Sequence, residues 1–276
     1  MKIFSTTMMT KIKKNCEKKD AEFLLLGAKA IDLDEYPNLK YIFRAGVGCD
    51  QIPIEGIQER GIELHFPTKE CRDVISMTVA KFTLGWILAE RSLQRTIEEW
   101  YREPVSSNKV VLIVGGAGHV GSKLMRLCQD VGIRSVPSDP KHGLFNYEEA
   151  DIVTFHVPLV SYEHGTVFRD NRNLISKDIL SKMKKDVVII NTSRGGIANE
   201  EDIAAFLKAN PQAKYITDVY QKEPYTDECV LSEFKGTQFF GTPHIGSYSE
   251  EVREALTDTA QGLIDSIEPP EKEEEE

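Results

Sequence analysis

Short apolar runs alternate with amphipathic stretches along most of the chain, and this alternation predicts strands and helices in turn. The apolar runs have the length of buried strands. They are 22–27, 40–45, 62–66, 110–114, 132–139, 151–157, 186–191, 213–218 and 237–241. Apolar residues at helical spacing occur in the stretches 53–61, 73–95, 122–128, 176–183 and 200–210. Because strands that alternate with helices form parallel sheets covered by helices, we predict an α/β fold.

The strand-like run at 110–114 leads into a glycine-rich turn, Gly116-Ala-Gly118-His-Val-Gly121, and then into a helical pattern. In a dinucleotide-binding unit, these glycines permit a tight turn, close approach of the backbone to a pyrophosphate, and close packing of helix on strand. The phosphates would lie on free N–H groups at the helix N-terminus, where the helix dipole favours negative charge. A glycine turn of this kind also occurs as a purely structural connection, so it indicates a cofactor site without establishing one.

Asp139 is a candidate for the acidic residue that follows the glycine turn in a dinucleotide-binding unit. It follows Gly121 by 18 residues, close to the separation of about 20 residues found for the acid that binds the adenosine ribose. A carboxylate there favours NAD, because it would repel the additional phosphate of NADP. The alternative is an ordinary turn Asp that precedes Pro140.

Length and composition narrow the class of protein. A chain of 276 residues with 41% hydrophobic residues is long enough for roughly two domains. Its five cysteines are scattered without a C-x-x-C pair, which indicates neither a zinc site nor a disulfide framework and fits a reducing compartment. No apolar run approaches the length of a membrane span, so we expect a soluble, cytoplasmic protein without a membrane partner.

The net charge of −10 is concentrated at the C-terminus, where 268–276 contains six Glu and one Lys. We predict that this stretch is a disordered acidic tail. The remainder of the chain carries only a small negative charge, which argues against a nucleic-acid partner.

Polar residues follow several of the later predicted strands. His156-Val-Pro158 and Asn191-Thr-Ser-Arg194 each end a strand-like run, whereas Asp218-Val-Tyr-Gln-Lys-Glu223 and Thr242-Pro-His244 come directly after one. In an open parallel sheet, ligands bind outside the carboxyl ends of the strands. We therefore expect these side chains to converge where a cofactor would lie.

Three of these residues have the chemistry of a hydride-transfer site. A carbinol hydroxyl must lose its proton when hydride leaves the carbon, and histidine exchanges protons near neutral pH. His244 is the best placed of the six histidines, since His65 and His156 lie within apolar strand runs. Glu223, in the neighbouring strand-end loop, would orient it. Arg194, flanked by Gly195, would grip a substrate carboxylate bidentately.

Together these motifs resemble the D-isomer-specific 2-hydroxyacid dehydrogenases, a family that includes the phosphoglycerate dehydrogenase branch. The matching stretches are 116–121 with Asp139, 156–159, 190–196, 218–224 and 242–246, and upstream 39–50 and 60–62. The resemblance spans about residues 37–267. It implies two Rossmann-like or flavodoxin-like lobes with parallel sheets and an interdomain cleft. The substrate-binding lobe would comprise 1–90 plus 250–267, and the NAD-binding Rossmann domain 91–249.

The resemblance also implies a role for each matching residue. Arg194, Glu223 and His244 would be catalytic, and the main chain at Gly46, Val47 and Gly48 would hold the substrate carboxylate together with Arg194. The stretch from Gly46 to Gly48 follows the strand-like run at 40–45. From its composition it fits either an anion-binding turn or an ordinary βα turn. The NAD site would be lined by Gly116, Gly118, His119, Val120, Gly121, Asp139, Val157, Thr192, Ser193, Asp218 and Gly246.

The reaction expected from the resemblance is NAD-dependent hydride transfer at C2 of a D-2-hydroxy acid or 2-oxo acid. The alternative is an NAD-sensing, corepressor-like binding protein, which would not require the complete set of Arg194, Glu223 and His244. The substrate stays open. The stretch 27–30 lacks the Arg that phosphoglycerate-type members often have, leaving Lys29 as a weak substitute, whereas 118–121 and 243–248 resemble erythronate-4-phosphate dehydrogenases.

Two departures from the family pattern bear on structure. The segment between Arg91 and the glycine turn is short, and it commonly contributes to the dimer, so the resemblance implies a homodimer whose mode of assembly stays open. The stretch from Asp139 to His156 is also compressed, so the cofactor lobe is expected to lack structure there.

Overall fold

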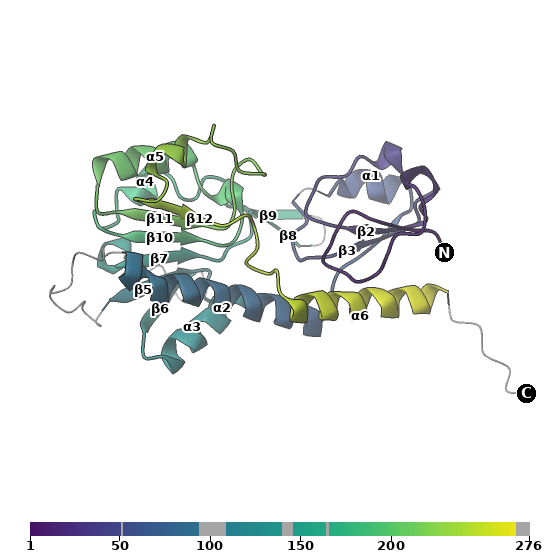
Figure 1. The fold of residues 1–276 in the computed structure, drawn as a ribbon, viewed down its shortest axis with the longest axis horizontal. Coiled ribbons are helices and arrows are strands. Elements are labelled where there is room, and N and C mark those ends of the chain that lie inside the picture. Colours follow the sequence, from purple (N-terminus) through teal and green to yellow (C-terminus); the bar gives the residue numbers. More distant parts are fainter. Residues whose placement is uncertain (51, 94–108, 140–145, 164–165, 269–276) are drawn as a thin grey trace, which may run out of the picture. The chain divides into compact units, whose positions relative to one another are not determined.

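The computed structural model describes residues 1–50, 52–93, 109–139, 146–163 and 166–268 (Figure 1). The chain forms two compact units, one made of residues 1–75 with 248–276 and one of residues 76–247. The divisions predicted from the sequence were at 90/91 and 249/250, and the functions expected of the two parts stay predictions. The predicted acidic tail, from 269 onward, and most of the short segment before the glycine turn, 94–108, lie outside the described residues.

The unit of residues 1–75 with 248–276 is built on a parallel sheet in the order β1-β2-β3-β4. The strands are β1 (Ile3–Ser5), β2 (Phe23–Leu26), β3 (Tyr41–Arg44) and β4 (Glu63–His65). The last three confirm the predicted runs, whereas β1 was not predicted. Its pairing with β2 is what defines it as a strand.

Both faces of this sheet are buried under packed side chains. Successive side chains of a strand point to opposite faces, so each strand contributes to both. Leu24 and Leu26 of β2 pack in one cluster with Ile57 of α1 (Ile54–Glu59). Phe23 and Leu25 pack in another, with one stripe of α6 (Glu250–Ile267). That stripe consists of Val252, Leu256, Ala260 and Ile264, which recur every four residues. The spacing places them on one face of the helix.

The unit of residues 76–247 contains a six-stranded parallel sheet in the order β12-β11-β10-β7-β5-β6. The strands are β5 (Val110–Val114), β6 (Arg134–Ser138), β7 (Ile152–Phe155), β10 (Val188–Asn191), β11 (Lys214–Thr217) and β12 (Phe239–Gly241). All six confirm predicted runs. Pro137 is tolerated in β6 because β6 lies at the edge of the sheet, where a missing N–H breaks no ladder.

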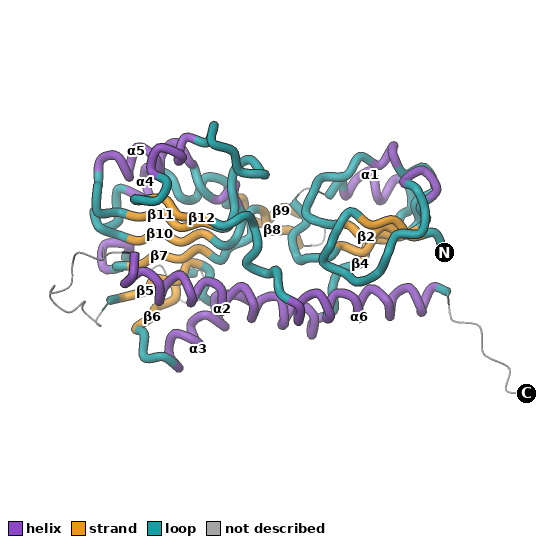
Figure 2. Tube along the Cα trace, in the orientation of Figure 1, coloured by secondary structure: helices purple, strands orange, loops and turns teal. Residues whose placement is uncertain are grey.

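Helices cover both faces of this second sheet (Figure 2). Side chains on one face pack against α4 (Lys177–Leu180) and α5 (Glu200–Ala209). Side chains on the other face pack against α3 (His119–Asp130) and part of α2 (Lys69–Leu93). The fold class is confirmed as two parallel-sheet α/β regions, with the sheet order reversing direction between β5 and β7, the kind of switch point where such sheets bind ligands.

Two connections depart from a regular strand–helix alternation. Between β6 and β7 the only described helix is a single 3-10 turn, Tyr147–Glu149, in agreement with the compression expected there. After β7 comes an antiparallel hairpin of β8 (Val160–Glu163) and β9 (Thr166–Asp170), which was not predicted. Asn171 anchors the base of this hairpin, since its side-chain amide donates to the carbonyl of Pro158 at 2.7 Å.

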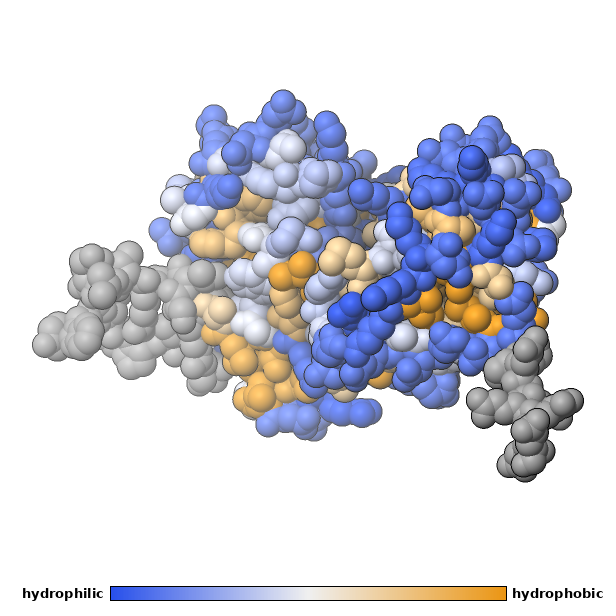
Figure 3. Space-filling model, turned by 45° about the vertical axis from the view of Figure 1, so that its right-hand side comes forward, coloured by the Kyte–Doolittle hydropathy of each residue, from blue (hydrophilic) through white to orange (hydrophobic). Residues whose placement is uncertain are grey.

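Charged and polar side chains cover much of the face shown in Figure 3, with apolar side chains gathered in smaller patches between them. Among the described helices, none combines the length and apolarity that a bilayer span requires.

Candidate active site

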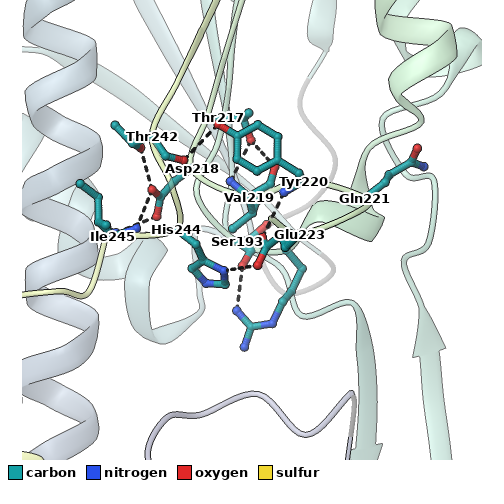
Figure 4. A network of polar contacts seen from close by, with 12 residues as sticks. Ser193, Thr217, Asp218, Val219, Tyr220, Gln221, Glu223, Thr242, His244 and Ile245 are labelled. Atoms are coloured by element: carbon teal, nitrogen blue, oxygen red, sulfur yellow. Dashed lines mark hydrogen bonds and ion pairs between the residues drawn. The ribbon is translucent and has the colours of Figure 1, made fainter. Parts of the chain in front are cut away.

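Three loops of the second unit leave the same edge of its sheet. Asn191, Thr217 and Gly241 stand side by side at the carboxyl ends of β10, β11 and β12. The loops that follow are 192–196, 218–224 and 242–246. They carry the residues predicted for catalysis, and Figure 4 shows polar contacts around them, among them the one between His244 and Glu223.

His244 and Glu223 form a hydrogen-bonded pair across two of these loops. Nδ1 of His244 lies 2.8 Å from Oε2 of Glu223, and each side chain is about one-third exposed. The other carboxylate oxygen, Oε1, accepts a hydrogen bond from the peptide N–H of Tyr220 at 3.2 Å. Burial raises the pKa of Glu223, but the hydrogen bond and charge of His244 outweigh it, so the pKa is lowered overall. Glu223 is therefore a carboxylate at neutral pH.

The backbone of His244 has φ of 56°, in the left-handed region that non-glycine residues seldom adopt. The carboxylate of Asp218 holds the loop in that conformation. Oδ1 accepts from the hydroxyl of Thr242 at 2.6 Å and from the N–H of Ile245 at 2.8 Å. Oδ2 accepts from the N–H of Gly246 at 2.7 Å. Asp218, only 2% exposed, thus fixes the chain on both sides of His244.

Arg194 is carried on a tight turn that the side chain of Asn191 shapes. Oδ1 of Asn191 accepts from the N–H of Ser193 at 3.1 Å and from its hydroxyl at 2.8 Å. The amide of Asn191 donates to the carbonyl of Arg194 at 3.0 Å. The guanidinium of Arg194 donates to the carbonyl of Ser193 at 2.8 Å, and its charge makes a small contribution to lowering the pKa of Glu223.

The predicted glycine turn connects β5 to α3, which begins at His119. A Cβ on Gly121 would lie 2.3 Å from the carbonyl oxygen of Gly115, so the close packing of helix on turn requires glycine. The peptide N–H of Ala117 donates to Oδ2 of Asp139 at 2.8 Å. The structure therefore brings the predicted acid directly to the glycine turn, as a dinucleotide-binding unit needs.

The remaining residues predicted for the NAD site lie near this edge. Val157 contacts the glycine turn, because a Cβ on Gly115 would lie 3.0 Å from its Cγ1. The hydroxyl of Thr192 lies 2.9 Å from that of Thr83 on α2, and both residues are buried. The N–H of Gly246 donates to the carboxylate of Asp218. Gly246 and Asp218, both predicted for the NAD site, therefore belong to the hydrogen-bonded network of the His244 loop. The assignment of all of them to NAD binding stays a prediction.

His156, directly after β7, lies in a different environment from His244. Both of its ring nitrogens are buried, and neither has a hydrogen-bond partner among the described residues. Burial lowers its pKa from 6.5 to about 3. An imidazole that stays neutral throughout the physiological range cannot exchange a proton with substrate, which leaves His244 as the better candidate.

The loop with Gly46, Val47 and Gly48 follows β3 in the unit of residues 1–75 with 248–276. Within that unit the guanidinium of Arg44 ties it to the neighbouring strand end. Nε donates to the carbonyl of Gly48 at 2.9 Å and Nη1 to that of Gly27 at 2.7 Å. The loop itself exposes Val47.

Neither Asn191 nor Tyr220 was predicted from the sequence to have a role, although both lie inside the motifs of the predicted site. Little in the sequence distinguished these two residues from their neighbours. Asn191 is a buried polar residue at a strand end, and the contacts of Tyr220 become visible only in the folded chain. No cluster of three or more metal-ligating side chains occurs within the described part of the chain.

The family model for "D-isomer specific 2-hydroxyacid dehydrogenase, NAD binding domain" matches residues 86–246, more than half of the chain. The chain belongs to this family. Its NAD-binding domain therefore contains the glycine turn, Asp139, and all three loops at the carboxyl edge, which confirms the predicted family and NAD as the cofactor.

Named relatives in this family act on different acids. The chain is 29% identical over 267 residues to D-3-phosphoglycerate dehydrogenase of Methanocaldococcus jannaschii, covering 86% of this chain and 48% of that protein. It is 28% identical over 236 residues to erythronate-4-phosphate dehydrogenase of Psychrobacter sp., covering 82% of this chain and 59% of that protein. The chain thus spans about half the length of these two relatives.

A solved dehydrogenase structure shares the fold of this chain. The D-lactate dehydrogenase from Aquifex aeolicus, complexed with NAD and lactic acid, superposes with a TM-score of 0.72 at 20% identity. The match covers 91% of this chain and 84% of that one.

Proposed function

We propose that this family member is an NAD-dependent oxidoreductase that moves a hydride between nicotinamide and C2 of a D-2-hydroxy acid or 2-oxo acid. The observation that carries the proposal is the His244–Glu223 hydrogen bond of 2.8 Å, at the sheet edge from which the Arg194 turn also leaves. The NAD-sensing alternative does not require this complete set and is not favoured.

The protonation of the pair follows from its geometry. Because Glu223 is ionised, it can only accept a hydrogen bond, so Nδ1 of His244 carries the proton. Nε2 is then the ring nitrogen that exchanges a proton with substrate. In the reductive direction, NADH held at this site would supply the hydride that C2 receives. The electron pair of the C=O π bond moves to the oxygen and forms the O–H bond with the proton that leaves Nε2 of the His244 imidazolium. Glu223 stabilises that imidazolium before the transfer.

Arg194 supplies the planar, permanently charged group that binds the substrate carboxylate bidentately. At Gly46, Val47 and Gly48 the main chain would form an anion site through the N–H groups of Val47 and Gly48, because that of Gly46 donates to the carbonyl of Arg44 at 2.8 Å. The glycine turn, with His119 and Val120 opening α3, would hold the pyrophosphate, and Asp139 would bind the adenosine ribose. The close packing of α3 on the turn that Gly121 permits, and the contact of Asp139 with the N–H of Ala117, both fit a dinucleotide-binding turn.

Substrate identity, assembly and location are finer parts of the proposal. We infer a small 2-oxo acid, with a phosphorylated and an unphosphorylated side chain both to be tested. The homodimer and the cytoplasmic location expected from the sequence are retained as proposals.

The decisive experiment is NADH oxidation by the purified protein with glyoxylate, hydroxypyruvate, pyruvate and phosphohydroxypyruvate. Turnover of at least one acid is expected, whereas NADH binding without turnover of any would overturn the proposal. His244→Ala should abolish turnover and retain NADH binding. The matched control is His65→Ala, because His65 also faces a carboxylate, Glu63 at 3.4 Å, but lies in β4 of the other unit.

A further inference from the structure

Tyr220 lies in the loop after β11, between Asp218 and Glu223, and touches each of the three loops that bear the proposed catalytic residues (Figure 4). Its side chain is buried, with only 8% of the residue exposed. The contacts come from three different parts of the residue: the phenol hydroxyl, the peptide N–H and the carbonyl.

The phenol reaches the His244 loop. Its hydroxyl donates to the carbonyl of Thr242 at 3.1 Å, and the same carbonyl accepts the peptide N–H of His244 at 3.0 Å. A Cβ on Gly241 would lie 2.4 Å from the phenol oxygen, so residue 241 must be glycine for the hydroxyl to reach its acceptor. Burial raises the pKa of Tyr220, which keeps the phenol protonated as a donor at working pH.

The peptide group of Tyr220 reaches the other two loops. Its N–H donates to Oε1 of Glu223 at 3.2 Å, which fixes the carboxylate that faces His244. Its carbonyl lies directly against the Arg194 turn, because a Cβ on Gly195 would stand 1.7 Å from the oxygen. One residue therefore contacts the neighbours of Arg194 and His244 and binds the Glu223 side chain itself.

We propose that Tyr220 is a positioning residue whose phenol hydroxyl and peptide group hold the Arg194, Glu223 and His244 loops in the arrangement that hydride transfer requires. This role rests on the proposed function and deepens it. The plain alternative is that the ring only fills space, since it packs on Tyr225 with ring centroids 5.0 Å apart. A phenylalanine would fill that space equally well, so the hydroxyl separates the two roles.

The test compares Tyr220→Phe with Tyr225→Phe. Tyr225 is the matched control because its hydroxyl bonds Ser232 at 2.6 Å, in the same aromatic cluster but away from the three loops. Loss of the Tyr220 hydroxyl should lower kcat about fivefold, as expected for one lost hydrogen bond that orients the reacting group. KM for the 2-oxo acid and the Kd for NADH should stay within about twofold, the pattern of an interaction that matters in the transition state. Tyr225→Phe should match wild type.

A double-mutant cycle tests the contact itself. Gly241→Ala places a methyl against the phenol oxygen and should lower kcat to a similar extent. In the Tyr220→Phe background the same substitution should cost much less, because the nearest obstructing atom is gone. Independent, additive losses would contradict the proposed contact.

Hydrogen exchange makes the inference testable apart from turnover. The amides of His244, Ile245 and Gly246 should exchange faster in Tyr220→Phe than in wild type and in Tyr225→Phe. If wild type reduces no 2-oxo acid, the proposed function fails, while the exchange rates still decide the role of Tyr220. Wild-type kcat in Tyr220→Phe, unchanged exchange, or an equal loss in Tyr225→Phe overturns the inference.

Discussion

The imidazole of His244 and the carboxylate of Glu223 meet at 2.8 Å although 21 residues separate them in the chain. Their meeting depends on adjacent parallel strands, β11 and β12, that end side by side. Glu223 is held from its other oxygen by the main chain at Tyr220, so the pair is oriented from both sides.

Glu223→Gln should lower kcat by about 10²-fold, because the amide keeps the shape but neither fixes the tautomer nor stabilises the imidazolium. The Kd for NADH should not change. The measurement is steady-state turnover beside fluorescence titration of NADH. Glu200→Gln is the control, since Glu200 accepts a main-chain bond from Gln221 at 2.8 Å but does not reach His244. Full activity in Glu223→Gln would remove the carboxylate from the mechanism.

Asp218→Ala should both destabilise the fold and disable His244. The substitution leaves two N–H groups and one hydroxyl without their buried acceptor. We expect a loss of about 3 kcal/mol in the free energy of unfolding. Urea unfolding gives the loss, with Asp227→Ala as the control because Asp227 is exposed and forms a surface ion pair with Lys235. Equal stability of the two variants would show that the Asp218 contacts contribute little.

Asp139→Asn should relax the choice between NADH and NADPH. Asn retains an acceptor for the N–H of Ala117 but removes the charge that opposes a 2′-phosphate. One like charge at about 5 Å, with an effective dielectric constant of about 20, is worth about 3 kcal/mol. The ratio of kcat/KM for NADH over NADPH should therefore fall by up to about 10²-fold. An unchanged ratio would show that Asp139 does not face the ribose.

His156 should make stability depend on pH between 7.5 and 5. In the unfolded chain a histidine binds a proton as the pH falls through 6.5, whereas in the fold burial lowers the pKa of His156 to about 3. The stabilising contribution is complete above pH 6.5 and is lost as the pH falls toward 3. At pH 5 the loss is about 2 kcal/mol. Urea unfolding of His156→Leu should show a pH dependence weaker by that amount, and identical slopes for variant and wild type would contradict this.

Much of the fold was predictable because it depends on local pattern. Alternating apolar runs identified the strands of the second sheet, and Pro137 marked β6 as a weak strand that the structure places at the edge. The pattern missed β1 and the hairpin of β8 and β9. These strands are defined by pairing with a partner strand, and that pairing leaves no pattern in the sequence.

The candidate site divides in the same way. The sequence by itself determined which chemical groups follow the strands, because parallel strands must bring their carboxyl ends to one edge. It therefore named Arg194, Glu223 and His244, and the family match places all three within the NAD-binding domain. Only the tertiary structure decided how they are held. Asp218 reaches the amides on both sides of His244, and Tyr220 reaches Thr242, across more than 20 residues of chain. Such contacts are set by the packing of adjacent loops, which depends on distances in space and not on spacing along the sequence.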